Sequence, residues 1–268
     1  IDTVSGTPNW NVFSTKQDAQ HQFKAAENLY VRNDWQDSLH KRIVTSKLTA
    51  ANKYVYSDND FIFLGRIVES ITGKPLNDYV RETFYLPLQM MSTTYKPREH
   101  YTINQVVPTE TEKHFRQQTI HADVHDEGAA MFGGVAGHAG LFSNAYDLVQ
   151  LYQMLLNGGE LNEQRFLQKE TIEKFTAYNS DISRRGLGFD KPEKDNANRK
   201  EPYPSKSVSP KTFGHTGFTG ICVWVDPQYN LIYIFLSNRV NPTRANNKLS
   251  QLNVRSNIQE AIYSALEK

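Results

Sequence analysis

The sequence has 268 residues, enough to bury a substantial hydrophobic core in one large domain or two small ones. Its 30 basic and 29 acidic residues nearly balance, which argues against a nucleic-acid or other polyanionic partner. The single cysteine, Cys222, excludes an internal disulfide framework, and its setting in ICVWV favours a buried, unreactive thiol. No apolar run reaches transmembrane length, and the first residues do not form a signal peptide. Because the chain opens with Ile1 rather than Met, we expect a processed or trimmed piece.

The first half of the chain predicts mainly helices. Apolar residues at 23, 26, 29 and 30 suggest one helical segment in an otherwise polar stretch. Apolar residues recur at helical spacing from Phe61 to Ile71, and Gly73 is a natural end for that helix. A second, short helix is expected over residues 77–84, and a long loop over residues 96–127.

The next segment predicts two further helices. After the Gly-rich stretch GGVAGHAG, Ser143 is the expected N-cap of a helix that ends at Gly158-Gly159. Another helix is expected over residues 170–177. Residues 190–211 are rich in Lys, Pro, Ser and Asn, which predicts an exposed loop.

The strands of the predicted sheet follow that loop. Ile221 to Val225 alternate in character as a strand with two different faces should. After a turn at 226–230, LIYIFL is apolar on both faces, which predicts a central strand. A last helix is expected over residues 249–266. We find no internal repeat. The expected architecture is a single α/β domain of the α+β type over residues 1–268, helical over about 20–180, with an antiparallel sheet and a C-terminal helix over about 185–268.

Two short motifs are candidates for chemistry. Tyr56-Ser57-Asp58 lies on a turn before the predicted 61–71 helix, where nearby cations would let a tyrosine act as a general base. The alternative is a tyrosine that only hydrogen-bonds at the entry of the helix. The second motif is FGHTGFTG, residues 213–220, whose glycines let a strand approach a substrate closely enough for its N–H groups to donate.

Together these motifs resemble those of the penicillin-recognising serine hydrolases, namely β-lactamases, D-Ala-D-Ala peptidases and related esterases. That family carries Ser-x-x-Lys, then Tyr-x-Asn or Ser-x-Asn, then Lys-Thr-Gly or His-Thr-Gly; here YSD stands second and HTG third. The resemblance covers about residues 25–265, including GGVAGHAGLFSNAYDLVQLYQMLLNGG. It looks closest to the serine-hydrolase module that follows a family-3 glycoside hydrolase module in some Bacteroidetes envelope proteins.

The resemblance implies a β-lactamase-like fold and an acyl-enzyme mechanism on a small-molecule or peptide substrate. It implies no cofactor and no metal, a periplasmic or secreted location, and a glycoside hydrolase module that can precede this one in the intact protein. Tyr56 matches the residue that relays the nucleophile's proton, His215 its electrostatic partner, and the backbone N–H of Phe218 an oxyanion-hole donor. The residues that the resemblance places at the substrate are Ser57, Asp58, Thr216 and Gly217. It makes the stretch with His125, Asp126 and His138 a wall of the cleft, where these side chains either contact substrate or brace the loop.

Two positions depart from the family pattern. Asp58 stands where an Asn is usual, which exchanges an amide that can donate for a carboxylate that accepts. His215 stands where β-lactamases have Lys, so a positive charge there requires a protonated imidazole. Both departures favour an ester or peptide substrate over efficient β-lactam hydrolysis.

The nucleophile is the missing part of the pattern. The one Ser-x-x-Lys in the sequence is Ser38 to Lys41, only 18 residues before Tyr56, whereas the family's serine lies much further upstream. Its surroundings, RNDWQDSLHKR, predict a solvated helix. We therefore expect the nucleophile, and two strands of the sheet, to precede Ile1, and the sheet to be incomplete on the side of LIYIFL. The alternative is that another chain covers this edge of the sheet.

Two alternatives remain open from the sequence alone. His121, His125, Asp126 and His138 are metal-ligand types, but the Gly-rich chain between them predicts a loop beside the site rather than a metal centre. The second alternative is a catalytically silent binding or structural module that kept the cleft and lost the chemistry.

Overall fold

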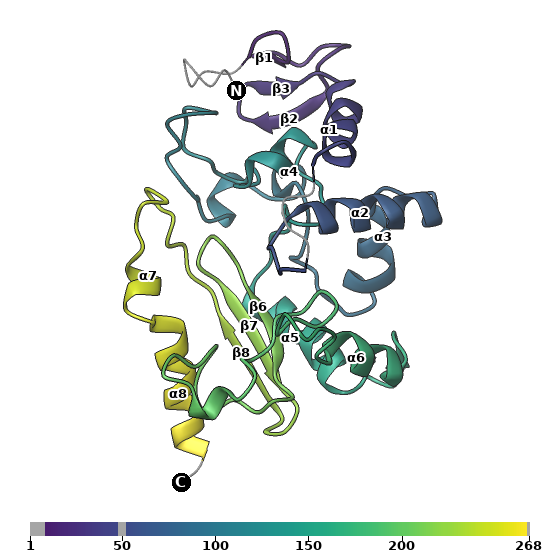
Figure 1. Ribbon diagram of the computed structural model, residues 1–268. Helices are drawn as coiled ribbons and strands as arrows, with labels where there is room; N and C mark the ends of the chain where they lie inside the picture. The colour runs from purple at the N-terminus through teal and green to yellow at the C-terminus, as the bar shows by residue number, and fades with distance from the viewer. Residues whose placement is uncertain (1–8, 48–51, 267–268) are drawn as a thin grey trace. The chain divides into compact units, whose positions relative to one another are not determined.

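The computed structural model describes residues 9–47 and 52–266, as a mixture of helices and antiparallel sheets (Figure 1). The α/β class predicted from the sequence is confirmed. The chain forms two compact units. Unit 1 comprises Ile1–Tyr85, Ser92–Ser143 and Val240–Arg244, and unit 2 comprises Leu86–Met91, Asn144–Arg239 and Ala245–Lys268. Of the two candidate motifs, Tyr56-Ser57-Asp58 therefore belongs to unit 1 and His215-Thr216-Gly217 to unit 2.

Unit 1 begins with a small antiparallel sheet where the sequence suggested a helix. Its strands are β1 (Phe13–Ser14), β2 (Phe23–Ala26) and β3 (Leu29–Val31), in the order β1-β3-β2. The helical prediction for this segment is wrong because Asn28 adopts a positive φ of 51° and closes a tight turn between β2 and β3. The hairpin then buries its apolar residues in the core of the unit.

The helices of unit 1 agree with the sequence pattern. They are α1 (Trp35–Val44), α2 (Asn59–Thr72) and α3 (Leu76–Val80), the last continued by a π-helical turn at Arg81–Tyr85. Gly73 ends α2 with a φ of 68°, as predicted. A Cβ on Gly137 would lie 2.0 Å from the carbonyl oxygen of Phe61, so this glycine permits the 133–140 loop to approach α2.

The long loop predicted over residues 96–127 is confirmed. It contains two 3₁₀ turns, Pro97–Glu99 and Ile103–Gln105, and leads to the short helix α4 (Glu127–Met131). Phe115, Ile120 and Val124 from this loop are buried with the N-terminal strands and with the alanines of α4. The loop is therefore part of the core of unit 1, which explains how it can hold polar side chains in fixed positions.

Unit 2 is built on the sheet that carries the third motif. Its strands β6 (Phe213–Thr216), β7 (Cys222–Asp226) and β8 (Leu231–Phe235) are antiparallel in the order β6-β7-β8. Among the described residues β7 is central, so the prediction of a central LIYIFL is wrong there. Within these limits β8 is the outer strand, and the sheet ends on the side of LIYIFL as expected.

Helices cover both faces of this sheet. Helix α5 (Ala145–Leu156) packs on β7 and β8, and Ile262 of α8 (Val254–Leu266) packs on the opposite face with Trp224 and Tyr233 (Figure 1). The helix predicted over 249–266 is divided, because Asn253, with a φ of 48°, separates α8 from α7 (Lys248–Gln251). Cys222 is 1% exposed, which confirms the predicted burial, and this burial raises the pKa of its thiol to about 11.

The remaining elements of unit 2 depart from the sequence analysis in detail. Asn144, not Ser143, caps α5, because its Oδ1 accepts the Asp147 N–H at 2.8 Å. The helix ends at Gly158-Gly159 as predicted, before a two-stranded hairpin of β4 (Glu160–Leu161) and β5 (Gln164–Arg165). The predicted 170–177 helix is α6 (Lys169–Thr176).

The segment 190–211 is irregular, as predicted, but it is not simply exposed. It contains one 3₁₀ turn, Asn196–Asn198, and Asp190, Lys191, Ser205 and Ser209 are all at least 96% buried. Its polar composition reflects side chains that hydrogen-bond inside unit 2 rather than a fully solvated loop. None of the helices in the described ranges has the length and apolar character needed to cross a bilayer, the longest being the 14-residue α2.

Lys191 makes this segment a source of pH-dependent stability. The residue is 2% exposed, its Nζ donates to the Thr212 carbonyl at 3.0 Å, and burial lowers its pKa to about 8. An unfolded lysine holds its proton up to about pH 10.4, so the free energy of unfolding should rise between pH 8 and that value. Replacing Lys191 with Met should raise the free energy of unfolding at pH 7 by about 1–3 kcal/mol and flatten this rise.

Urea denaturation followed by circular dichroism at pH 7, 8, 9 and 10 checks this prediction. Lys194→Met is the matched control, because Lys194 is exposed and lies three residues further along the same segment. If the free energy of unfolding of Lys191→Met rose between pH 8 and 10 as steeply as that of the wild type, Lys191 would not be the source of the pH dependence.

Candidate active site

The second motif lies at the start of α2, as the sequence predicted. Tyr56 and Ser57 precede the helix, Asp58 is its N-cap residue, and the Asn59 N–H donates to Ser57 Oγ at 3.2 Å. The Tyr56 side chain is 61% exposed. The turn thus presents a phenol at the surface of unit 1 beside the positive end of a helix, an arrangement suited to a group that exchanges protons with a ligand.

Three of the predicted substrate-site residues come together in unit 1. Oxygen or nitrogen atoms of Asp58, Asp126 and His138 all lie within 4.8 Å of one another, and His138 Nε2 is 2.8 Å from Asp126 Oδ1. Burial opposes ionisation of Asp126, but hydrogen bonds from His138 and the Ala129 N–H outweigh it and lower the pKa of the carboxyl. The loop that carries Asp126 and His138 is therefore placed beside the second motif.

This trio has the donor types of a divalent-cation site, and in the described part of the chain it is the one such cluster. A metal-bound histidine normally donates its second ring N–H to an acceptor, whereas His138 Nδ1 is buried without a hydrogen-bond partner. The geometry therefore fits an imidazole that positions carboxylates better than it fits a metal ligand. His121 is held apart from the trio, because its Nε2 contacts the Val106 carbonyl at 2.6 Å.

His125 belongs to a separate buried network in unit 1. The residue is 7% exposed, and its Nε2 lies 2.9 Å from Glu110 Oε2. The same carboxylate accepts from Arg244 Nε at 2.6 Å, and Arg244 Nη2 donates to Glu127 at 2.7 Å. Burial opposes ionisation of Glu110, yet the hydrogen bonds from Arg244 and His125 lower its pKa. This network ties the 240–244 segment to the loop that precedes α4.

The third motif lies on β6 and enters a glycine-dependent turn in unit 2. His215 pairs with Val223 of β7, and the Gly217 N–H donates to the Ile221 carbonyl at 2.8 Å. A Cβ on Gly214 would lie 2.0 Å from the Val223 carbonyl oxygen, and one on Gly217 would lie 2.5 Å from Ile221 Cγ1. The strand and hairpin predicted for this motif are confirmed. Gly214 is required by its close approach to β7, and Gly217 by its close approach to Ile221.

The residues around the turn show how it is held. The Phe218 ring is 60% exposed and carries the Arg239 guanidinium 4.7 Å from its centroid. Arg239 Nε also donates to the Phe218 carbonyl at 2.9 Å. Both contacts restrain Phe218, whose backbone N–H is the predicted oxyanion-hole donor.

The sequence analysis missed the charged residues behind the third motif. Arg185 Nη1 lies 2.6 Å from His215 Nε2, and Arg184 Nε lies 2.9 Å from the buried Asp190 carboxylate. Tyr203 donates to the same carboxylate at 2.8 Å. In the sequence these residues are visible only as two adjacent arginines in a polar loop. Such a pair does not indicate which residues it contacts.

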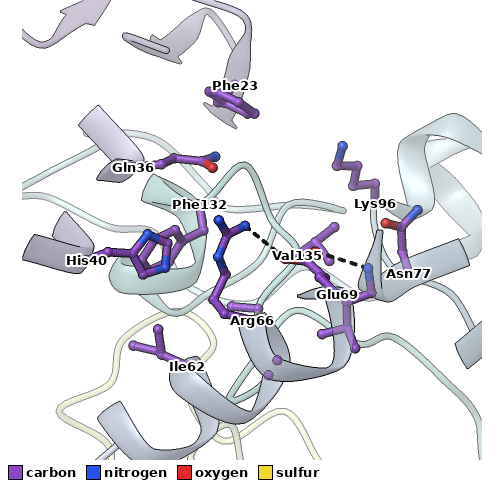
Figure 2. Close-up of a pocket in the computed structure, with 14 residues that line it drawn as sticks. Phe23, Gln36, His40, Ile62, Arg66, Glu69, Asn77, Lys96, Phe132 and Val135 are labelled. Atoms are coloured by element: carbon purple, nitrogen blue, oxygen red, sulfur yellow. Dashed lines mark hydrogen bonds and ion pairs between the residues drawn. The ribbon is translucent and has the colours of Figure 1, made fainter. Parts of the chain in front are cut away.

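A separate pocket lies in unit 1 between α1, α2 and the loop after α4 (Figure 2). Its volume is about 170 Å³, and its wall includes His40, stacked on Phe132 with ring centroids 4.9 Å apart. Arg66 on the other wall is already paired with Glu69 at 2.9 Å. Neither motif contributes to the described lining, so this pocket is not the predicted site.

Comparison with known proteins identifies the family to which these motifs belong. Residues 6–255 match the Beta-lactamase family. The chain belongs to the beta-lactamase family. It is 36% identical over 212 residues to a Salmonella enteritidis PT4 protein and 38% identical over 201 residues to an Escherichia coli K12 protein, both named "Putative D-alanyl-D-alanine carboxypeptidase". The matches cover 74% and 70% of this chain, and 48% and 45% of those proteins. This beta-lactamase family chain thus spans about half the length of the curated relatives it matches.

Solved structures agree with the fold of this beta-lactamase family chain. A penicillin-binding protein homologue from Caulobacter crescentus superposes with a TM-score of 0.52 at 19% identity, over 76% of this chain and 58% of that one. A Bacillus anthracis protein titled "Putative 6-aminohexanoate-dimer hydrolase" gives 0.53 at 17% identity, over 85% and 49%. The family resemblance drawn from YSD and HTG is confirmed at this level.

Proposed function

We propose that this chain is part of a serine hydrolase of the penicillin-binding type, which cleaves a peptide, ester or amide through an acyl-enzyme. One observation carries the proposal: a beta-lactamase family chain keeps both a Tyr-Ser-Asp turn at the start of α2 and a His-Thr-Gly strand that enters a glycine-dependent hairpin. The relatives named as carboxypeptidases support a peptide substrate.

The proposed roles follow the family motifs. A serine hydroxyl attacks the substrate carbonyl, Tyr56 takes its proton and returns it to the leaving group, and water then releases the acyl group by the reverse sequence. His215 and its surroundings supply the electrostatic support. The Phe218 N–H donates to the oxyanion, a type of contact whose removal costs about 2.7–4 kcal/mol of transition-state stabilisation. The residues proposed to contact substrate are Ser57, Asp58, Thr216, Gly217, Asp126 and His138. The buried His125 is proposed to brace the loop that carries Asp126.

The proposed nucleophile is a serine outside these 268 residues. Ser38 has the required sequence context, but its Oγ donates to the Asp34 carbonyl at 3.3 Å within α1, and Lys41 is exposed. Neither feature activates a hydroxyl. We also propose that residues 1–268 belong to one domain and that the intact protein lies in the cell envelope, with a family-3 glycoside hydrolase module before this one. The resemblance to Bacteroidetes proteins supports the last two points.

Active-site labelling of the full-length protein tests the proposal. A fluorophosphonate probe, followed by peptide mapping, should label one serine of a Ser-x-x-Lys motif outside residues 1–268. Labelling by a fluorescent penicillin should be weaker, since Asp58 and His215 depart from the β-lactamase pattern. Ser38→Ala should label as the wild type does.

Two results would overturn parts of the proposal. A label on Ser38 would place the nucleophile in α1. A folded protein that takes no label would favour the silent binding module instead.

A further inference from the structure

His215, the head of the third motif, makes two ring contacts with opposite requirements. Its Nδ1 lies 2.6 Å from the Thr216 carbonyl oxygen, and its Nε2 lies 2.6 Å from Arg185 Nη1. A carbonyl oxygen can only accept, so Nδ1 must carry a proton. A guanidinium is always protonated and can only donate, so Nε2 must present its lone pair.

Together the two contacts specify one form of the ring. These contacts fit a neutral imidazole with its proton on Nδ1, because either of the other two forms would set an N–H of the ring against an N–H of Arg185. The positive charge at this end of β6 is then that of Arg185, whose side chain is 21% exposed.

Arg185 is anchored to β6, the strand that carries His215. Asp190 exchanges two backbone hydrogen bonds with Gly214, at 2.7 and 3.0 Å, directly before His215. The Asp190 side chain is 1% exposed, lies 3.4 Å from Arg185 Nε, and also binds Arg184 and Tyr203. A buried carboxylate with several donors is a rigid anchor, so the guanidinium and β6 are fixed to the same residue.

We propose that Arg185 is a positioning residue that locks His215 in the neutral Nδ1–H tautomer and supplies the permanent positive charge of the third motif. A lysine in this motif would carry that charge itself, whereas here the charge is separated from the ring that the motif provides. The consequence for catalysis rests on the proposed serine hydrolase function: the electrostatic support assigned to His215 would come from Arg185.

Nitrogen-15 NMR of histidine side chains tests the proposal without relying on activity. The protein is labelled with ring-¹⁵N histidine, and His215→Asn identifies the His215 signals. At pH 7.5 the wild-type ring should show a protonated Nδ1 and an unprotonated Nε2. Arg185→Met, which has no donor, should lose this single-tautomer signature, and Arg185→Lys should keep it, because an ammonium can also donate to Nε2.

Arg184→Met is the matched control. Arg184 binds the same Asp190 carboxylate but donates to Glu193 rather than to His215, so its removal should leave the His215 signals unchanged. Three results would overturn the proposal: a wild-type His215 protonated on Nε2, an unchanged signature in Arg185→Met, or an equal loss in Arg184→Met. The wild-type spectrum decides the tautomer even if a variant fails to fold. A full-length protein that takes no active-site label would refute the proposed function and leave this result intact.

Discussion

Replacing Tyr56 with Phe is expected to slow acylation of the full-length protein by about 10²- to 10⁴-fold, the usual contribution of a positioned general base. The substitution removes one hydroxyl from a side chain that is 61% exposed on the turn before α2. Urea unfolding of the variant checks that the fold is retained. Stopped-flow measurement with a chromogenic ester separates the acylation rate from substrate binding, and the loss should fall on the rate.

Tyr54→Phe is the matched control for this experiment. Tyr54 lies two residues earlier, is 46% exposed and stands outside the motif, so its variant should acylate at the wild-type rate. If Tyr56→Phe also acylates at the wild-type rate while the active-site label still forms, another group takes the nucleophile's proton. An equal loss in both variants would indicate a change in the turn rather than in proton transfer.

The helices of this chain were predictable where the spacing of apolar residues was compatible with only one type of secondary structure. From Phe61 to Ile71 the apolar spacing fits only a helix, and Gly73 supplies the left-handed end. Residues 23–30 are compatible with two types of secondary structure, because four apolar residues over eight positions suit either a short helix or two short strands. The left-handed conformation of Asn28 decides for the hairpin, and no residue spacing reveals it.

The site was predictable in its motifs and not in their supports. Each of the two motifs, YSD and HTG, is a run of consecutive residues, so the sequence alone locates Tyr56 and His215. Arg185 reaches His215 because Asp190 bridges to β6, a contact formed only when the 177–190 loop returns to the sheet. Asp58 approaches Asp126 and His138 for the same reason, since Gly137 allows the loop to pack against α2. Such contacts depend on tertiary packing between segments that share no local pattern.

Replacing Asp226 with Ala should lower the free energy of unfolding at pH 7 by several kcal/mol, since each buried donor left unsatisfied costs about 1–3 kcal/mol. Asp226 ends β7 and is 1% exposed. Its carboxylate accepts from the Ser209 N–H and Oγ at 2.9 and 2.6 Å, from Tyr263 Oη at 2.7 Å and from the Gln228 N–H at 3.0 Å. The alanine variant would leave these donors in unit 2 without their acceptor.

The same carboxylate should make unit 2 sensitive to acid. Burial opposes ionisation of Asp226, but the hydrogen bonds from Ser209 and Tyr263 outweigh it and lower its pKa. A lowered native pKa stabilises the fold above the unfolded value of about 3.9, and this stabilisation is lost as the pH falls through the native pKa. Urea unfolding of wild type and Asp226→Asn should therefore differ most near pH 7 and converge in acid. Asp181→Asn, at an exposed position, should follow the wild type throughout. A difference between wild type and Asp226→Asn that stays constant down to pH 2 would show that the ionised carboxylate is not what holds Ser209 and Tyr263 to β7.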